Sequence, residues 1–246
     1  MHKEWKSRTR LMAGEAGMAK LEQANVLVVG LGGVGACAAE MICRAGVGRM
    51  TLVDGDAVDH SNINRQLIAL TSTLQNRKTE VLAARLRDIN PEIQLTLVDE
   101  FLRDDRMIEL LDSQKYDYVV DAIDTLSPKT FLIFHTLNRG YPLVSSMGAG
   151  GKWDPTRLVI TDISKTFQCK LARMIRKRLH KLGVHSGFKA VFSSEEVAED
   201  TFLVEDGLMN KKTTVGTISY MPAAFGLACA SVVIRGLSGH QEAPEV

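Results

Sequence analysis

The stretch Val26–Gly35, VLVVGLGGVG, constrains the fold of this chain more than any other part of it. An apolar run typical of a buried strand leads directly into Gly30, Gly32, Gly33 and Gly35, and a helical pattern follows. Glycines permit positive φ angles and let the backbone approach a phosphate closely. The helix that follows offers unpaired N–H groups and the positive end of its dipole. The stretch therefore predicts a strand–turn–helix unit that binds a nucleotide.

Apolar runs and helical patterns alternate over the first 150 residues. Strands are predicted at Val26–Val29, Met50–Val53, Gln94–Val98, Tyr118–Asp121 and Pro142–Ser145. Helices are predicted at Val34–Arg44, Arg77–Asn90, Asp105–Asp112 and Pro128–Arg139. This alternation predicts an α/β fold with a Rossmann-like, mostly parallel sheet and helices on both faces.

The pattern changes after Gly148, where we expect a strand at Leu158–Thr161, which extends the sheet with antiparallel pairing, and a basic helix at Cys169–Leu182. A polar stretch, 195–212, is predicted to be a loop, and an apolar helix with Pro222 in its first turn closes the fold. The tail from Ser238 is expected to be disordered. We expect a nucleotide-binding region in residues 1–150 and an extension in residues 151–246, within one compact domain.

Composition narrows the class of protein. Of the 246 residues 45% are hydrophobic, the formal net charge is +1, and no run of 18 apolar residues indicates a membrane span. The N-terminus lacks the apolar core of a secretion signal. The cysteines Cys37, Cys43, Cys169 and Cys229 form no C-x-x-C pair, which argues against a zinc site or a disulfide framework. A cytoplasmic, reduced protein is expected.

The glycine turn by itself fits NAD and ATP equally. Asp54 follows the turn by about 20 residues, the position from which a carboxylate accepts hydrogen bonds from ribose hydroxyls. The next segment, DGDAVDHSNINRQ, and two later positions add groups that an NAD dehydrogenase does not need. These added residues are Asp56, Asn62, Arg65, Gln66, Lys78 and Asp124. Cations together with a metal-binding carboxylate suit a nucleotide whose phosphates react, although Arg65 or Lys78 taken alone is also compatible with a solvated surface charge.

Four motifs now carry a family resemblance: VLVVGLGGVG, LVDGDAVDHSNINRQ, RKTEVLAARLRDINP and VVDAIDT. They resemble the adenylating domain of the ThiF/MoeB and ubiquitin-activating-enzyme superfamily. The resemblance implies ATP and Mg²⁺ as cofactors, with Asp54 on the ribose, Asn62, Arg65 and Lys78 on the phosphates and Asp124 on the magnesium ion. It also implies a homodimer in which Arg8, or alternatively Arg10, reaches the phosphates of the partner subunit.

The second half resembles the tRNA threonylcarbamoyladenosine dehydratases in SSMGAGGKWDPTRLVITDISKT, CKLARMIRKRLHKLGV, AVFSSEE and GTISYMPAAFGLACASVVI. Lys170 stands where that family is expected to have proline. The resemblance implies ATP-dependent cyclising dehydration of the modified adenosine in tRNA through an acyl-adenylate. Sulfur-transfer proteins remain possible partners. An enzyme that adenylates a sulfur-carrier protein is the alternative, and the missing C-x-x-C pairs count against it.

Residues 163–194 contain no Asp or Glu and many cations, which predicts a positive patch. RNA phosphate is a suitable partner for such a patch. The candidate RNA-binding residues are Lys165, Lys170, Arg173, Arg176, Lys177 and Lys181. From the residues alone a solvated helix face remains an equal interpretation. An NAD-dependent oxidoreductase and a non-catalytic RNA-binding scaffold also stay open. Cys169, at the start of the basic helix, is the cysteine with a minor prospect of function.

Overall fold

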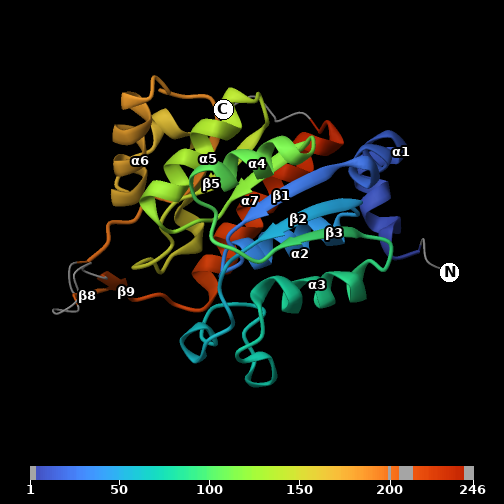
Figure 1. The fold of residues 1–246 in the computed structure, drawn as a ribbon, viewed down its shortest axis with the longest axis horizontal. Coiled ribbons are helices and arrows are strands. Elements are labelled where there is room, and N and C mark those ends of the chain that lie inside the picture. Colours follow the sequence, from blue (N-terminus) through green and yellow to red (C-terminus); the bar gives the residue numbers. More distant parts are fainter. Residues whose placement is uncertain (1–3, 199–200, 205–212, 241–246) are drawn as a thin grey trace.

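The computed structural model describes residues 4–198, 201–204 and 213–240. Within these residues a seven-stranded sheet has the order β3-β2-β1-β4-β5-β7-β6 (Figure 1). Its strands are β1 (Asn25–Val29), β2 (Arg49–Val53), β3 (Gln94–Val98), β4 (Tyr118–Asp121), β5 (Leu143–Ser146), β6 (Leu158–Asp162) and β7 (Lys189–Ser193). All neighbours pair in parallel except β6 with β7. The strand order reverses between β1 and β4, which is where open α/β sheets bind their ligands.

Helices cover both faces of the sheet (Figure 1). Their bounds are α1 (Ser7–Gln23), α2 (Gly35–Arg44), α3 (Lys78–Ile89), α4 (Asp104–Ser113), α5 (Leu126–Asn138), α6 (Lys170–Lys181) and α7 (Tyr220–Ser238). One core cluster joins Val26 and Val28 of β1 to side chains of α1, α2, α3 and α7. The other joins Leu27 and Val29 to α4, α5 and α6. The alternation of side chains along β1 thus supplies both cores, and every residue of that strand is buried.

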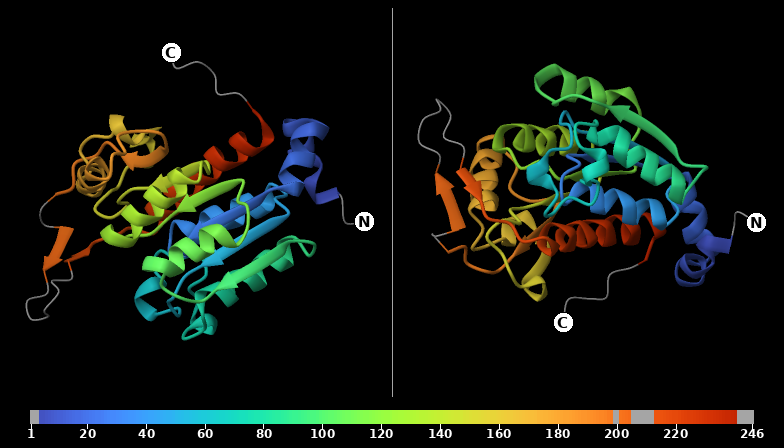
Figure 2. Two further views of the ribbon diagram at one scale, coloured as in Figure 1. Left: turned by 45° about the horizontal axis from the view of Figure 1, so that its top comes forward. Right: turned by 90° about the horizontal axis from the view of Figure 1, so that it is seen from below.

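Helix α7 packs on one face of the sheet, and it lies along α2 when the molecule is seen from below (Figure 2). Gly226 makes this contact possible, because a Cβ atom there would lie 2.5 Å from the carbonyl oxygen of Val34. Among the described helices, α7 is the one that is long and apolar enough to cross a membrane. Met221, Phe225 and Cys229 are fully buried in the core cluster on this face, which is the setting of a core helix.

The predicted fold class is confirmed: the parallel sheet, the helices on its two faces and the antiparallel β6 are all present. The stated bounds of β3 and β4 match the observed ones, and the other stated bounds differ by at most two residues. Three elements were missed: α1, β7 and the hairpin of β8 (Phe202–Val204) with β9 (Thr213–Val215). The loop prediction for residues 195–212 is therefore wrong at β8. The disorder predicted from Ser238 onward is wrong for the first residues, because Ser238 ends α7, Gly239 caps the helix and the N–H of His240 donates to the carbonyl of Arg235 at 3.1 Å. Residues 199–200 and 205–212 of the predicted loop, and 241–246 of the predicted disordered tail, lie outside the described residues.

Helix α1 was missed because its sequence has a weak amphipathic pattern. Leu11 and Met12 are exposed, and Gly14 interrupts the helix with a φ of 69°. Only Met18 and Leu21 anchor its second half in the core. The short strand β7 was missed because the stretch KAVFS carries no turn signal of its own, and it is held by pairing to β5 and β6.

The burial of α7 gives a prediction about stability. Phe225→Ala should lower the free energy of unfolding by about 3–5 kcal/mol, because it removes a fully buried ring and leaves a cavity. Leu227→Ala on the same helix should change it by less than about 1 kcal/mol, since Leu227 is half exposed. Urea unfolding followed by circular dichroism measures both variants. Equal losses for the two variants would contradict the assignment of α7 as a core helix.

Candidate adenylating site

The glycine turn between β1 and α2 is closed by contacts that no side chain would permit. A Cβ atom at Gly35 would lie 1.7 Å from the carbonyl oxygen of Gly30, and one at Gly30 would lie 2.7 Å from that of Ala122. Gly30 has a φ of 89°, and its N–H donates to the carbonyl of Val53 at 2.8 Å. The turn therefore brings the start of α2 to the carboxyl ends of β1, β2 and β4.

Asp54 ties the end of β2 to this turn. Its Oδ2 accepts from the N–H of Leu31 at 2.6 Å, and its Oδ1 accepts from the N–H of Asp56 at 2.8 Å. Burial raises the pKa of this carboxyl group, and the nearby Lys78 ammonium and the two backbone donors partly oppose that effect. The side chain thus combines fixed geometry with partial loss of water. Such a carboxylate is suited to accept hydrogen bonds from a ribose.

Lys78 and Arg65 supply positive charge at the same edge. Lys78 begins α3, its side chain is only 6% exposed, and its Nζ lies 2.8 Å from Oδ2 of Asp56. Arg65 donates to the carbonyl of Ser61 at 2.6 Å, and its own carbonyl would lie 2.9 Å from a Cβ atom at Gly33. Lys78 therefore lies beside the Asp54–Asp56 segment, and the backbone of Arg65 packs on the glycine turn; their phosphate-binding role stays a prediction.

Asn62 and Gln66 have different surroundings. Asn62 takes part in a capping box with Asp59: its Oδ1 accepts from the N–H of Asp59 at 3.1 Å, so part of its side chain organises the loop. Gln66 is 8% exposed, and its Oε1 has no hydrogen-bond donor among the described residues. Its Nε2 would lie 3.6 Å from a Cβ atom at Gly32. Gln66 therefore has a buried acceptor close to the turn with no donor among the described residues, and its contact with a ligand stays a prediction.

A buried ion pair fixes the loop that carries Asp124. Nζ of Lys129 lies 2.8 Å from Oδ2 of Asp121 at the end of β4, and both side chains are 0% exposed. Lys129 also donates to the carbonyl of Ile123 at 2.9 Å, and Asp121 accepts from the N–H of Ile123 at 3.1 Å. Ser145 of β5 donates to Asp121 at 2.6 Å. Both sides of residue 123 are therefore held immediately before Asp124.

Sequence reasoning missed this pair. Asp121 lies within the VVDAIDT motif, but nothing local marks Lys129, on a helix, as fully buried. A lysine is seldom buried without a partner. Only the packing of α5 on β4 brings the two side chains together.

Asp124 itself is exposed at the strand end. The described residues contain no group of three His, Cys, Asp or Glu side chains that could hold a metal ion. Mg²⁺ in nucleotide sites is commonly held by one or two carboxylates plus the phosphates, with water completing the octahedron. A single exposed carboxylate beside the phosphate-binding turn fits that mode of binding.

Arg8 lies on α1, which runs at the amino ends of the strands, opposite the glycine turn (Figure 1). At this edge Gly48, which directly precedes β2, packs closely on the carbonyl of Glu22 in α1. Arg10 donates to Glu15 and lies 3.8 Å from Glu22, whereas Arg8 is exposed. The chain's own site is therefore out of reach of both, and between the two Arg8 is the one not engaged in those ion pairs.

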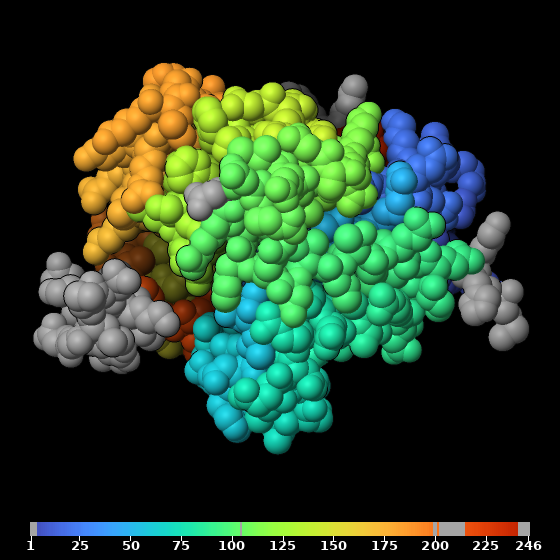
Figure 3. Space-filling view, in the orientation of Figure 1, coloured from blue at the N-terminus to red at the C-terminus, as the bar shows by residue number. Residues whose placement is uncertain are grey.

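Helix α6 carries most of the predicted RNA-binding residues on the surface of the molecule (Figure 3). Ala172, Ile175 and Leu179 face the core, which leaves Arg173 and Lys177 exposed. Lys165, Lys170 and Lys181 are exposed as well. Arg176 differs from the others, because it is half-buried and donates to the backbone carbonyl of Thr166 at 2.8 Å. Arg176 therefore stabilises the backbone at Thr166, and a charge reversal at this position would remove that hydrogen bond.

All four cysteines are buried and free. Burial raises the pKa of Cys43 and of Cys229 to about 12, and it also raises the pKa of Cys37. Cys169 caps α6, with its Sγ accepting from the N–H of Ala172 at 3.5 Å. A buried thiol with a raised pKa is a poor nucleophile, so the structure offers no support for covalent catalysis by Cys37, Cys43 or Cys229.

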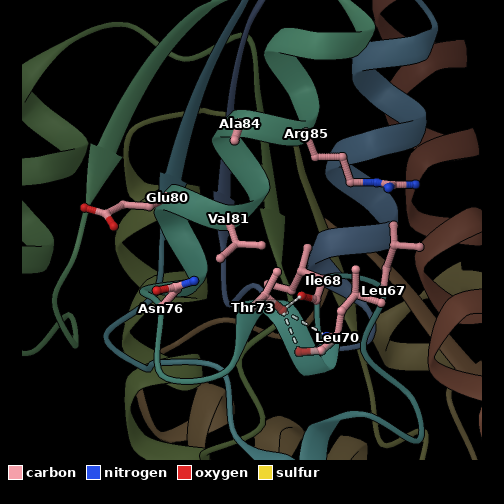
Figure 4. A pocket seen from close by; sticks show the side chains of 9 residues that line it. All are labelled: Leu67, Ile68, Leu70, Thr73, Asn76, Glu80, Val81, Ala84 and Arg85. Atoms are coloured by element: carbon pink, nitrogen blue, oxygen red, sulfur yellow. Dashed lines mark hydrogen bonds between the residues drawn. The ribbon is translucent and has the colours of Figure 1, made fainter.

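An apolar cavity of about 420 Å³ lies away from these residues, between α3 and the segment that follows the Arg65 loop (Figure 4). Leu67, Leu70 and Val81 line it. None of the predicted site residues does, so this cavity has no part in the chemistry described above.

Comparison with known proteins gives a family and close relatives. The model of the ThiF family matches residues 6–246. The tRNA threonylcarbamoyladenosine dehydratase of Bacillus subtilis is 39% identical over 238 residues, covering 94% of this chain and 93% of that protein. An adenylyltransferase and sulfurtransferase of Candida glabrata is 32% identical but covers only 63% of this chain and 36% of its own length.

Solved structures agree with this result. The crystal structure of E. coli tRNA N6-threonylcarbamoyladenosine dehydratase in complex with ATP matches with a TM-score of 0.86 and 36% identity, covering 95% of this chain and 93% of that one. The same protein in complex with AMP matches with a TM-score of 0.85.

Two glycines of the turn give a prediction that separates effects on ATP binding from effects on the stability of the fold. A Cβ atom at Gly32 would meet nothing closer than 3.6 Å, so Gly32→Ala should change the free energy of unfolding by less than about 1 kcal/mol. It should nevertheless weaken ATP binding at least about tenfold, because the methyl group occupies the space that a phosphate needs. Gly35→Ala is the control, since its collision with Gly30 should destabilise the fold itself. Isothermal titration and urea unfolding measure both, and normal ATP affinity in Gly32→Ala would remove the phosphate from this turn.

Proposed function

The chain belongs to the ThiF family, and from that premise we propose that it is an ATP-dependent enzyme that dehydrates and cyclises N6-threonylcarbamoyladenosine in tRNA, with release of AMP and pyrophosphate. The observation that carries the proposal is the match to the B. subtilis dehydratase, which spans nearly the full length of both proteins. The carrier-adenylating relative matches only part of the chain. The similarity to the dehydratase therefore includes the second half of the chain, which carries the basic helix.

The chemistry explains why ATP is needed. The substrate carries a free carboxylate, which is a poor electrophile because its leaving group would be oxide. A carboxylate oxygen attacks the α-phosphorus of ATP, pyrophosphate leaves, and a mixed anhydride with AMP forms. The carbamoyl group of the same modification then attacks the activated carbonyl, the ring closes, a proton is lost and AMP leaves. The tRNA loses one water, and no protein nucleophile is required.

The residues of this chain would act by positioning and by charge. We propose that Asp54 holds the ribose, that Gly30, Gly32, Gly33 and Gly35 admit the phosphates, and that Lys78 and Arg65 stabilise the charge that develops on the phosphates. Lys78 already pairs with Asp56, so it would turn from that carboxylate to a phosphate or bridge the two. Gln66 offers its unused Oε1 to a donor of the nucleotide.

Mg²⁺ would be held by Asp124 and would neutralise phosphate charge. The backbone around Ile123 is fixed by Asp121 and Lys129, so the Asp124 carboxylate would be presented without a large reorganisation. We further propose a homodimer in which Arg8 of one subunit reaches the phosphates of the other, because α1 lies too far from the glycine turn of its own chain (Figure 1). A cytoplasmic location and sulfur-transfer partners remain parts of the proposal.

One reaction tests the proposal. The protein is mixed with ATP, Mg²⁺ and tRNA that bears threonylcarbamoyladenosine, and the digested nucleosides are analysed by mass spectrometry. We expect a nucleoside lighter by one water, formed in equal amount with AMP. Asp124→Asn should lower the rate by at least about a hundredfold without unfolding the protein, since the residue is exposed and its loss removes stabilisation of the reacting phosphates.

Two results would contradict this prediction. Wild-type turnover by Asp124→Asn would exclude that carboxylate from the site. No change in nucleoside mass with a competent substrate, together with ATP–pyrophosphate exchange that depends on a small protein ending in Gly-Gly, would favour the carrier-adenylating alternative.

A second prediction concerns the basic helix. Arg173→Glu with Lys177→Glu should weaken tRNA binding and reduce the slope of log Kd against log salt by about one for each phosphate that the variant no longer neutralises. These two residues are chosen because both are exposed, whereas Arg176 supports the fold. Arg87→Glu with Lys115→Glu makes the same change of charge elsewhere on the surface and should have little effect. Equal affinities for the two double variants across a salt series would mean that α6 is a solvated face.

A further inference from the structure

Two aromatic side chains stand exposed at the carboxyl edge of the sheet. Trp153 is 63% exposed and Tyr220 is 44% exposed. Trp153 lies in the connection after β5, and Tyr220 is the first residue of α7. The hydroxyl of Tyr220 donates to the carbonyl oxygen of Trp153 at 2.8 Å, which joins the two segments. We call Trp153 and Tyr220 the aromatic pair.

The start of α7, which carries Tyr220, packs on the glycine turn. Pro222, in the first turn of α7, would be 2.7 Å from a Cβ atom at Gly33. The segment before α7 is also tied to the Arg65 loop, because Nδ2 of Asn64 donates to the carbonyl of Thr217 at 3.0 Å. The start of α7 therefore packs on the loops that carry the proposed phosphate-binding residues.

The backbone at Trp153 is held firmly. The carboxylate of Glu195 accepts from the N–H of Trp153 at 3.2 Å and from that of Asp154 at 3.0 Å. The neighbouring Lys152 is 2% exposed and donates to the carbonyl of Glu195. An exposed indole on a fixed backbone loses little conformational entropy when a ligand stacks on it.

Helix α6 begins close to the same segment. A Cβ atom at Gly148 would be 3.9 Å from Cβ of Leu171, and Gln168 donates to Glu196, next to the Glu195 that holds Trp153. The start of this cationic helix is therefore linked to the segment that holds the backbone of Trp153. An RNA strand could place its phosphates on the cations and a base on the aromatic side chains at the same time.

We propose that the aromatic pair stacks on the target base: Trp153 and Tyr220 bind the adenine that carries the modification and hold its carboxylate toward the nucleotide on the glycine turn. Single exposed apolar residues are common on protein surfaces. Here the two aromatic residues are joined by a hydrogen bond, and the segments that carry them are tied to the glycine turn and to the start of the cationic helix, which suits an unstacked base of a single-stranded loop. The inference deepens the proposed function, on which it rests.

Fluorescence tests the stacking directly. The chain has two tryptophans, and Trp5 lies at the opposite edge of the sheet beside Lys6. In a Trp5→Phe background the emission reports Trp153 alone. We expect an anticodon stem–loop RNA that bears threonylcarbamoyladenosine to quench this emission with saturation, whereas heparin, which offers negative charge without bases, should not quench it.

Kinetics gives the second readout. Trp153→Ala should raise the KM for modified tRNA about tenfold and leave the KM for ATP unchanged. Trp153→Phe should restore most of the affinity, because a smaller ring still stacks. Phe131→Ala, on the outer surface of α5 and 44% exposed, is the matched control and should behave as the wild type.

The outcomes separate the stacking proposal from the proposed function. Unchanged Trp153 emission with bound stem–loop, equal quenching by heparin, or a wild-type tRNA KM in Trp153→Ala would each overturn the stacking. Quenching by a stem–loop that is never dehydrated would support the stacking and overturn the proposed function. Dehydration of the modified stem–loop without quenching of the Trp153 emission would support the proposed function and overturn the stacking.

Discussion

The site depends on the contact between Gly30 and Gly35, where backbone occupies the space of a side chain. Because no Cβ atom intervenes, α2 begins directly at the end of β1 and its first N–H groups face the edge of the sheet. The same lack of side chains lets α7 approach, through Gly33 against Pro222 and through Gly226 against Val34. One turn therefore sets both the start of α2 and the packing of the helix that completes the fold.

The charges around this turn are organised by strand ends. Asp54 after β2 and Asp124 after β4 come from strands on the two sides of β1, so parallel pairing alone brings them to one edge. Burial and hydrogen bonding then make the two carboxylates different. Asp54 is held by two backbone donors. Asp124 is exposed and directly follows a loop that the Asp121–Lys129 pair fixes. Breaking such a buried pair generally costs about 3–5 kcal/mol, because an unpaired charge is left in the interior.

Much of this arrangement could be predicted. The strands of the first half, the fold class and the position of Asp54 at the glycine turn all follow from periodicity and from the rule that ligands bind at strand ends. The elements that were not predicted share a physical cause. The hydrophobic patterns of α1, β7 and β8 are short or weak, and contacts with neighbouring elements stabilise them. Lys129 was missed for the same reason, since its partner is remote from the local helix pattern.

The parallel sheet, the glycine turn and the cationic character of α6 can be read from the amino-acid sequence, because apolar periodicity, glycine spacing and the lack of acidic residues are local properties. Which cations face the solvent follows from packing, since Arg176 donates to Thr166 while Arg173 and Lys177 are exposed. Tertiary structure also joined Trp153 and Tyr220, which are 67 residues apart in the chain, by a hydrogen bond. Such contacts depend on the direction in which whole elements pack, and no local pattern encodes that direction.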